Sequence, residues 1–340
     1  MNHDDHHENP VLRPKVLVTG ANGFLGCHIV RLLLDRGYAV RAFVLKGTSS
    51  DTLPESDCEI FEGDLLNERD VDRALSGCDS VIHTAAITDV WPTVNPLSWT
   101  VNFELVRRLA GRIRAMNVRR YVHVGTANSF GFGTKDAPGD ENTPFNSGGY
   151  GLDYINSKKA AQDYLLAEAK AGLPVVIVNP TFMIGDNDAK PGPGEMIISV
   201  MKGKVPAYAS GGRSFAPVKD VAAATVNALE MGRVGECYIA GGTNLNYREF
   251  FTMIGEIARC EPPKHRISKP LAMLFATLVE WAAGARRKKP LLTRAMARIS
   301  GDGHYYSSRR AIAELGYVKT DVATALREAI LWYQEHGYVE

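Results

Sequence analysis

Cysteine, net charge and long apolar runs are all scarce in this sequence. Its 340 residues include five scattered cysteines, an odd number with no Cys-x-x-Cys pair. This pattern argues against a disulfide framework or a zinc site and indicates reduced thiols in a cytoplasmic protein. The formal net charge of +1 gives no electrostatic reason to expect a nucleic-acid partner. Residues 1–8 contain no apolar run, so we expect residues 1–13 to be a flexible tail and not a signal peptide.

The composition that is present is typical of a globular protein, with 45% hydrophobic and 23% charged residues. Short apolar segments alternate with segments of helical period along the first half of the chain. The expected strands are 15–19, 39–45, 58–62, 80–83, 120–124 and 175–178, and the expected helices are 27–36, 68–75, 96–116 and 154–171. Repeated strand–helix units predict an α/β fold with a doubly wound parallel sheet of the Rossmann type, which binds ligands at the carboxyl ends of its strands.

The segment between the first strand and the first helix, Gly20-Ala-Asn-Gly23-Phe-Leu-Gly26, has the glycine spacing of a phosphate-binding turn. Gly20 permits the tight turn, Gly23 lets a pyrophosphate approach the backbone, and Gly26 lets the helix pack close to the strand. The helix N-terminus then offers free N–H groups to the phosphates. A plain glycine-rich turn is the alternative, but the strand before it and the helix after it favour dinucleotide binding.

A tyrosine and a lysine stand four residues apart in the expected helix 154–171. Tyr154 and Lys158 therefore share one helical face, and no other of the 13 tyrosines has a lysine at this spacing. An ammonium beside a phenol favours the phenolate, which lowers the phenol's pKa toward the range of an acid–base catalyst. His83 and His123 also lie near strand ends, and we interpret both as core histidines and not as catalysts.

Two motifs together resemble those of the extended short-chain dehydrogenase/reductase family, and the resemblance covers nearly the whole chain. They are Thr19-Gly20-x-x-Gly23-x-x-Gly26 and Tyr154-x-x-x-Lys158. The resemblance implies that Tyr154 is the proton donor or acceptor, and that Lys158 lowers its pKa and holds the nicotinamide ribose. Residues 125–131 resemble the family's Ser-Ser-x-x-x-Tyr-Gly segment, which places the catalytic hydroxyl on Thr126. Two hydroxyls at the reacting oxygen suit hydride transfer to a carbonyl, and this chemistry needs no metal.

Two further segments resemble the cofactor-binding motifs of the family: 63–65 its adenine-contacting turn and 83–86 its fourth-strand motif. NAD-specific members usually carry a carboxylate at the end of the second strand. Here Leu45 is followed by Lys46, which favours NADPH and leaves NAD open as the cofactor. The implied cofactor contacts are Gly20, Gly23, Phe24, Leu25, Gly26, Lys46, Asp64, Leu65, Thr84, Ala85, Ala86, Tyr154 and Lys158.

After residue 178 the alternation of strand and helix weakens. Helical period returns near 195–202, 247–258 and 271–283, and segment 215–240 resembles a return to the main sheet. We therefore expect an NAD(P)-binding domain at 14–178, to which 215–240 returns. Residues 179–214 and 241–340 are expected to form mainly a smaller, mostly helical substrate domain over the carboxyl edge of the sheet.

Less specific sequence similarities resemble the dihydroflavonol reductase and 3β-hydroxysteroid dehydrogenase branch of the family. They lie at 40–42, 179–181, 206–208 and 305–317. They imply an NAD(P)-dependent oxidoreductase that interconverts an alcohol and a carbonyl on a hydrophobic small molecule. A nucleotide-sugar epimerase of the same fold and a non-catalytic NAD(P)-binding sensor stay open as alternatives. Thr126 is followed by Ala127-Asn128 and not by the Asp-Glu pair of dehydratases, which argues against dehydration.

The apolar stretch 271–279 precedes a basic run, Arg286-Arg-Lys-Lys289. About ten apolar residues are too few to span a bilayer, which needs about 20. Three interpretations stay open for 271–289: peripheral membrane contact through an interfacial helix with a basic collar, a lid over an apolar pocket, and an ordinary packing helix. Whether the chain forms a homodimer is open as well.

Overall fold

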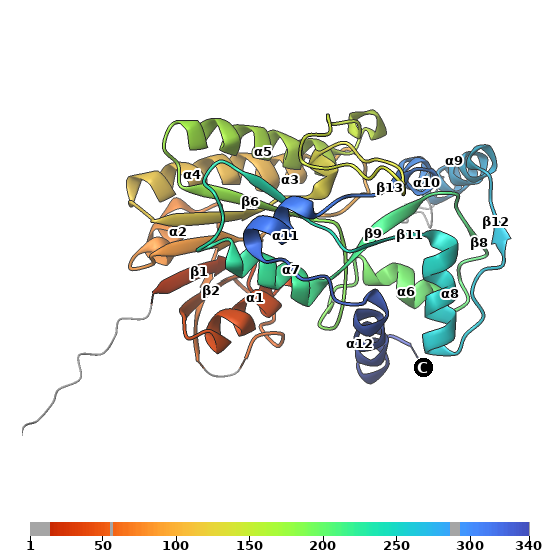
Figure 1. Ribbon diagram of the computed structural model, residues 1–340, viewed down its shortest axis with the longest axis horizontal. Coiled ribbons are helices and arrows are strands. Elements are labelled where there is room, and N and C mark those ends of the chain that lie inside the picture. Colours follow the sequence, from red (N-terminus) through yellow and green to blue (C-terminus); the bar gives the residue numbers. More distant parts are fainter. Residues whose placement is uncertain (1–13, 55–56, 286–292, 340) are drawn as a thin grey trace, which may run out of the picture.

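The computed structural model describes residues 14–54, 57–285 and 293–339 (Figure 1). The predicted tail 1–13 and the basic run 286–289 therefore lie outside the described residues. Seven strands form one parallel sheet in the order β10-β6-β5-β4-β1-β2-β3, and the predicted doubly wound sheet is confirmed. Its strands are β1 (Lys15–Thr19), β2 (Ala39–Leu45), β3 (Cys58–Gly63), β4 (Ser80–His83), β5 (Arg120–Val124), β6 (Val175–Pro180) and β10 (Cys237–Ala240).

Both faces of this sheet are covered by helices, so its strands are apolar on both sides. In β1, Val16 and Val18 belong to one core and Leu17 to the other, because successive strand residues point to opposite faces. The first face is covered by α1 (Phe24–Asp35), α7 (Val218–Asn227) and α11 (Arg309–Leu315), and the second by α2 (Glu68–Leu75), α4 (Leu105–Ala115) and α5 (Asp153–Lys170).

Some helices differ in their bounds from the prediction. α1 begins at Phe24, three residues before the predicted start, because Gly23 already serves as its N-cap. The predicted helix 96–116 comprises α3 (Pro96–Trp99), a π-helical turn at Thr100–Glu104, and α4. α8 (Tyr247–Ala258) has the predicted bounds, and a capping box formed by Asn246 and Glu249 marks its start.

The remaining elements lie at the end of the molecule opposite β2 and α2 (Figure 1). Their helices are α6 (Gly194–Met201), α8, α9 (Lys269–Ala285), α10 (Arg294–Gly301) and α12 (Val322–Glu335). A small sheet, which the sequence did not predict, has the order β11-β9-β13 with β7 also paired to β9, and β8 pairs with β12. These strands are β7 (Phe182–Ile184), β8 (Ala207–Tyr208), β9 (Gly212–Pro217), β11 (Thr243–Asn246), β12 (His265–Arg266) and β13 (Gly303–His304).

A separate core holds this part together. The rings of Phe215 on β9 and Phe250 on α8 stack with their centroids 3.7 Å apart, and Leu326 and Tyr333 of α12 are buried in the same cluster. Strands of two or three residues, such as β7, β8, β12 and β13, carry too little periodicity to be recognised in a sequence. The division into a cofactor domain and a substrate domain stays a prediction. Within the described ranges, no helix is both long and apolar enough to cross a membrane.

The close packing of α1 on the turn before it yields a first prediction. A Cβ added to Gly26 would overlap the carbonyl oxygen of Gly20 and lie 2.9 Å from the Cα of Ala21, and neither is a side chain that can swing aside. We expect Gly26→Ala to lower the free energy of unfolding by about 1–3 kcal/mol. Chemical denaturation of the variant and the parent measures this difference.

Gly111→Ala is the matched control, because Gly111 lies inside α4 and a Cβ there meets no atom within 4 Å. This substitution should raise the free energy of unfolding by about 0.5–1 kcal/mol, through the loss of glycine's backbone freedom in the unfolded chain. Equal stabilities of Gly26→Ala and the parent would show that the helix does not need this close approach.

Candidate active site at the carboxyl edge of the sheet

The carboxyl edge of the parallel sheet gathers the residues that the sequence singled out. Because neighbouring strands run in the same direction, the chain leaves β1 to β5 at one edge. Gly20 follows β1, Lys46 follows β2, Asp64 follows β3, Thr84 follows β4, and Thr126 lies two residues after β5. The predicted cofactor contacts therefore lie along a single edge, although they span more than a hundred residues of sequence.

The glycine turn lies against the end of β4. Gly20 has a φ of +67°, and a Cβ there would lie 2.8 Å from the backbone nitrogen of Ala85. The hydroxyl of Thr84 donates to the carbonyl of Thr19 at 2.7 Å, which fixes the two strand ends together. Ala86 continues the same segment and is half-buried. The space at the turn exists only because a side chain is absent there, and this suits the close approach of a pyrophosphate.

The N-terminus of α1 completes this cradle. Gly23 is the N-cap residue and has no side chain to bond the first N–H groups, and no acidic residue stands in the first turn, which includes Phe24, Leu25 and Gly26. A helix start without an acid or a capping side chain leaves its N–H groups and its positive dipole end for an anion. The residues present thus fit the phosphates of a dinucleotide.

The loops after β2 and β3 flank the glycine turn. The side-chain amide of Asn22 donates to Thr48 Oγ1 at 3.0 Å and to the carbonyl of Ser49 at 2.7 Å, which ties the loop after β2 to the turn. Lys46 is exposed in this loop. After β3, Asp64 accepts a hydrogen bond from the backbone of Leu66 at 2.8 Å, and Leu65 between them is half-buried against the sheet core.

Thr126 and Tyr154, which the sequence singled out, lie close together. Burial raises the pKa of the Tyr154 phenol, whereas hydrogen bonding with Thr126 and the positive charge of Arg213 lower it. The backbone carbonyl of Thr126 accepts from the side-chain amide of Asn179 at 3.0 Å. That same amide donates to Gln162 Oε1 of α5 at 2.8 Å. Asn179 thus links β6, the loop after β5 and α5, and so fixes where the Thr126 hydroxyl lies.

Lys158 follows Tyr154 by four residues on α5 and is 3% exposed. Its ammonium donates to the carbonyl of Val124, the last residue of β5, at 2.7 Å. Burial lowers the pKa of Lys158 to about 8. The positive charge that lowers the pKa of Tyr154 in this structure is that of Arg213. The Lys158 ammonium is directed at the β5 carbonyl, and its effect on the phenol stays a prediction.

His83 and His123 lie side by side on β4 and β5, with ring centroids 5.5 Å apart. His83 Nδ1 pairs with the Thr19 hydroxyl at 2.7 Å and His123 Nδ1 with the Tyr121 hydroxyl at 3.1 Å. Burial and the charge of Lys158 lower the pKa of both rings, to about 3 for His83. Both histidines are therefore neutral core residues, in agreement with their interpretation from the sequence.

Sequence reasoning did not find two residues of this region, Arg213 and Tyr150. Arg213 on β9 donates from Nε to the Tyr247 hydroxyl at 3.1 Å and lies over the Phe182 ring, 5.4 Å from its centroid. Its charge lowers the pKa of Tyr150 as well as that of Tyr154. Nothing near Arg213 in the sequence indicates this position, whereas Tyr150 could have been noticed because it lies four residues before Tyr154.

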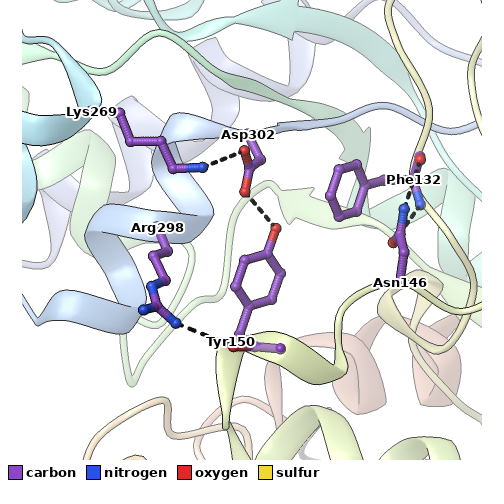
Figure 2. A pocket seen from close by; sticks show the side chains of 7 residues that line it. Phe132, Asn146, Tyr150, Lys269, Arg298 and Asp302 are labelled. Carbon is purple, nitrogen blue, oxygen red and sulfur yellow. Dashed lines mark hydrogen bonds and ion pairs between the residues drawn. The ribbon is translucent and has the colours of Figure 1, made fainter.

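A pocket of about 310 Å³ opens beside Tyr150 (Figure 2). The Tyr150 hydroxyl donates to Asp302 Oδ2 at 2.9 Å, and the Lys269 ammonium donates to Asp302 Oδ1 at 2.8 Å. Tyr154 and Thr126 do not line this pocket, but Tyr150 and Tyr154 pack against the same apolar cluster, so we call it the outer pocket of the site. Its lining residues are Phe132, Asn146, Gly149, Tyr150, Lys269, Arg298 and Asp302.

Comparison with known proteins identifies the family. The model of the NAD dependent epimerase/dehydratase family matches residues 16–241, which include the glycine turn, Thr126, Tyr154 and Lys158. The chain belongs to this family. As a member of the epimerase/dehydratase family it is an NAD-dependent enzyme that acts on hydroxyl or carbonyl groups.

Individual relatives align over almost the whole chain. A putative dihydroflavonol 4-reductase from Synechocystis sp. is 30% identical, over 95% of both chains. Sterol demethylase protein B from Methylococcus capsulatus is 31% identical, over 95% of this chain and 99% of its own. Among solved structures, a nucleoside-diphosphate-sugar epimerase from Pseudomonas aeruginosa superimposes with a TM-score of 0.80 at 26% identity, over 96% of this chain and 99% of the other. The similarity supports the dihydroflavonol reductase and hydroxysteroid dehydrogenase branch of the family.

The buried ammonium of Lys158 predicts a pH dependence of stability. In the folded protein Lys158 loses its proton near pH 8, whereas the ordinary value is 10.5. Between these pH values the unfolded state binds more protons, so the free energy of unfolding rises with pH across this window. The full rise is roughly 3 kcal/mol, from about 1.4 kcal/mol for each unit of pKa difference.

Lys158→Met isolates this effect, because other groups that titrate in the window are the same in both proteins. Urea denaturation from about pH 7 to about pH 11 should show the parent gaining stability relative to Lys158→Met as the pH rises. A difference between the two proteins that stays constant with pH would mean that the Lys158 ammonium titrates at its ordinary value.

Proposed function

We propose that this enzyme is an NAD(P)-dependent oxidoreductase that interconverts an alcohol and a carbonyl on a hydrophobic small molecule of the steroid, flavonoid or secondary-metabolite type. The observation that carries the proposal is the closeness of the Thr126 hydroxyl to the Tyr154 phenol, one helical turn from the buried Lys158. Two hydroxyls at one point can bond a reacting oxygen, and one of them can ionise. A protein that only binds NAD(P), as a sensor does, has no need of this set.

Each side chain has a separate task in this proposal. When bound, the nicotinamide cofactor supplies or accepts the hydride. Tyr154 gives a proton to the carbonyl oxygen or takes it from the alcohol, and Thr126 donates a hydrogen bond to the same oxygen. Lys158 holds the nicotinamide ribose. Arg213 favours the phenolate of Tyr154 through its charge, and this assists the direction in which the alcohol is oxidised.

The surroundings of Tyr154 support a hydrophobic substrate. The phenol packs against an apolar cluster that contains Leu152 and Ile155 from its own region of the chain and Ala295 and Ile299 from α10. An apolar wall excludes water and suits a substrate without charge near the reacting carbon. The names of the dihydroflavonol reductase and the sterol protein that align over 95% of this chain are in line with such a substrate.

A nucleotide-sugar epimerase is the second candidate, and the outer pocket favours it. Two basic side chains, Lys269 and Arg298, line that pocket (Figure 2). A diphosphate would find cations there, although Asp302 already offsets the charge of Lys269 at 2.8 Å. A screen that follows nicotinamide absorbance with both cofactors separates the candidates. Isomerisation of a nucleotide sugar without net cofactor turnover would establish the epimerase in place of the oxidoreductase.

Tyr154→Phe tests the proton transfer. Removing the ionisable hydroxyl should lower kcat by about 10²–10⁴-fold. Cofactor affinity, followed by fluorescence titration, should stay nearly unchanged, because the ring remains. Tyr164→Phe is the matched control, since Tyr164 is half-buried on the same helix, away from the carboxyl edge. Equal activity of Tyr154→Phe and the parent would rule out the proposed mechanism.

Lys158→Ala should damage both activity and cofactor affinity, because the ammonium serves the ribose and the geometry of β5 together. Its neighbour Lys159 is directed to the surface, where it pairs with Asp163, so Lys159→Ala should leave both quantities unchanged. If Lys158→Ala lowers kcat but leaves the cofactor affinity intact, Lys158 does not hold the ribose.

Lys46→Glu tests the choice between NADPH and NADH. Lys46 is exposed after β2, and neither Leu45 nor Lys46 offers a carboxylate for the ribose 2′-hydroxyl. If Lys46 pairs with a 2′-phosphate, the substitution should shift the ratio of kcat/KM for NADPH over NADH toward NADH by more than a few-fold, since the new carboxylate also repels the phosphate. Lys170→Glu, at the exposed end of α5, makes the same charge change elsewhere. An unchanged ratio in Lys46→Glu would remove Lys46 from the site.

A further inference from the structure

One side of α9 carries large apolar side chains that are exposed. They follow the helical spacing of a single face, and the most exposed of them, Trp281, is 77% exposed. The opposite side of the helix packs on α10 through Ala272, Ala276 and Ala297, which are buried together. The exposed residues, which we call the α9 stripe, are Leu271, Leu274, Phe275, Leu278 and Trp281.

Positive charge is concentrated in the stretch of sequence that contains α9. Residues 264–302 contain nine Lys and Arg against two Asp and Glu, whereas the rest of the chain contains 30 against 36. The near-neutral net charge of the chain is thus the sum of a basic segment, 264–302, and an acidic remainder. Lys264 and Arg266 are exposed just before the helix, and Arg294 is exposed on α10 beside it.

We propose that α9 docks on an anionic lipid surface, with its stripe in the interface and the surrounding cations at the headgroups. An apolar helix face edged by basic residues and carrying a tryptophan suits the boundary between headgroups and acyl chains. A second copy of the chain fits less well on the stripe. A symmetric contact through α9 would bring two basic segments together, and like charges in an interface oppose association.

The position of α9 gives this docking a consequence for the site. Lys269, the first residue of α9, lines the outer pocket and pairs with Asp302 (Figure 2). α9 and α10 lie together at the periphery of the molecule (Figure 1). A docked α9 therefore holds the outer pocket next to the lipid, from which a hydrophobic substrate can enter. This consequence rests on the proposed function, whereas the docking itself does not.

Vesicle binding tests the docking without any turnover. The full chain is sedimented with vesicles of phosphatidylcholine alone and with vesicles that also contain phosphatidylglycerol. The parent should bind the anionic vesicles, and Leu274→Glu/Leu278→Glu should weaken that binding more than about tenfold. Leu331→Glu on α12 is the matched control, because Leu331 is 56% exposed and Leu278 is 58% exposed. All three proteins should have the same Tm and the same activity on a water-soluble substrate.

Brominated lipids add a readout that identifies the helix face. They should quench the tryptophan fluorescence of the parent, and Trp281→Phe should lose most of that quenching. The proposal is overturned if the parent does not bind, if the double substitution leaves binding unchanged, or if both kinds of vesicle bind equally. It is also overturned if the parent is a dimer that the double substitution converts to a monomer, since the stripe would then join two copies. Loss of turnover with intact vesicle binding would count against the proposed function alone.

Discussion

The parallel pairing of seven strands is the constraint on which the rest of this structure depends. It brings the ends of β1 to β5 to one edge, so that the glycine turn and the loop of Thr126 lie along the same edge. Two contacts then hold that edge together. The Thr84 hydroxyl bonds the carbonyl of Thr19, and the Lys158 ammonium bonds the carbonyl of Val124. Both use backbone carbonyls at strand ends, and the Thr19 carbonyl also accepts from the backbone N–H of Thr84 at 3.1 Å.

Two opposing effects act on the pKa of the Tyr154 phenol: burial raises it, and neighbouring polar and charged groups lower it. Burial raises the pKa of Tyr154 and lowers that of Lys158, so burial alone disfavours the charged form of each. Arg213 and Thr126 counter this effect at Tyr154 from two other elements, β9 and the loop after β5. The pKa of Tyr154 therefore depends on the small sheet as well as on the main sheet, since the strand that carries Arg213 belongs to the small sheet.

The outer pocket and the phenol differ in character. The phenol contacts an apolar cluster, whereas the pocket beside Tyr150 contains Lys269, Arg298 and Asp302. A substrate with a hydrophobic reacting part and a polar far end would satisfy both. The same two cations keep the nucleotide-sugar candidate open, and the family contains enzymes of both kinds. Membership of the family thus determines the reaction at the hydroxyl or carbonyl group. The segments over the sheet edge determine which substrate carries that group into the site.

The sequence alone determined the local features of this protein: the six strands 15–178, the glycine turn, the Tyr154–Lys158 spacing and helix 247–258. Each has a repeating or short-range pattern, because burial on a strand or helix recurs with the period of the backbone. Only the tertiary structure decided that Arg213 acts on Tyr154, that Lys158 is directed at Val124, and that a small sheet lies beside the main one. These depend on contacts between residues far apart in sequence and on strands as short as two residues, for which no local pattern exists.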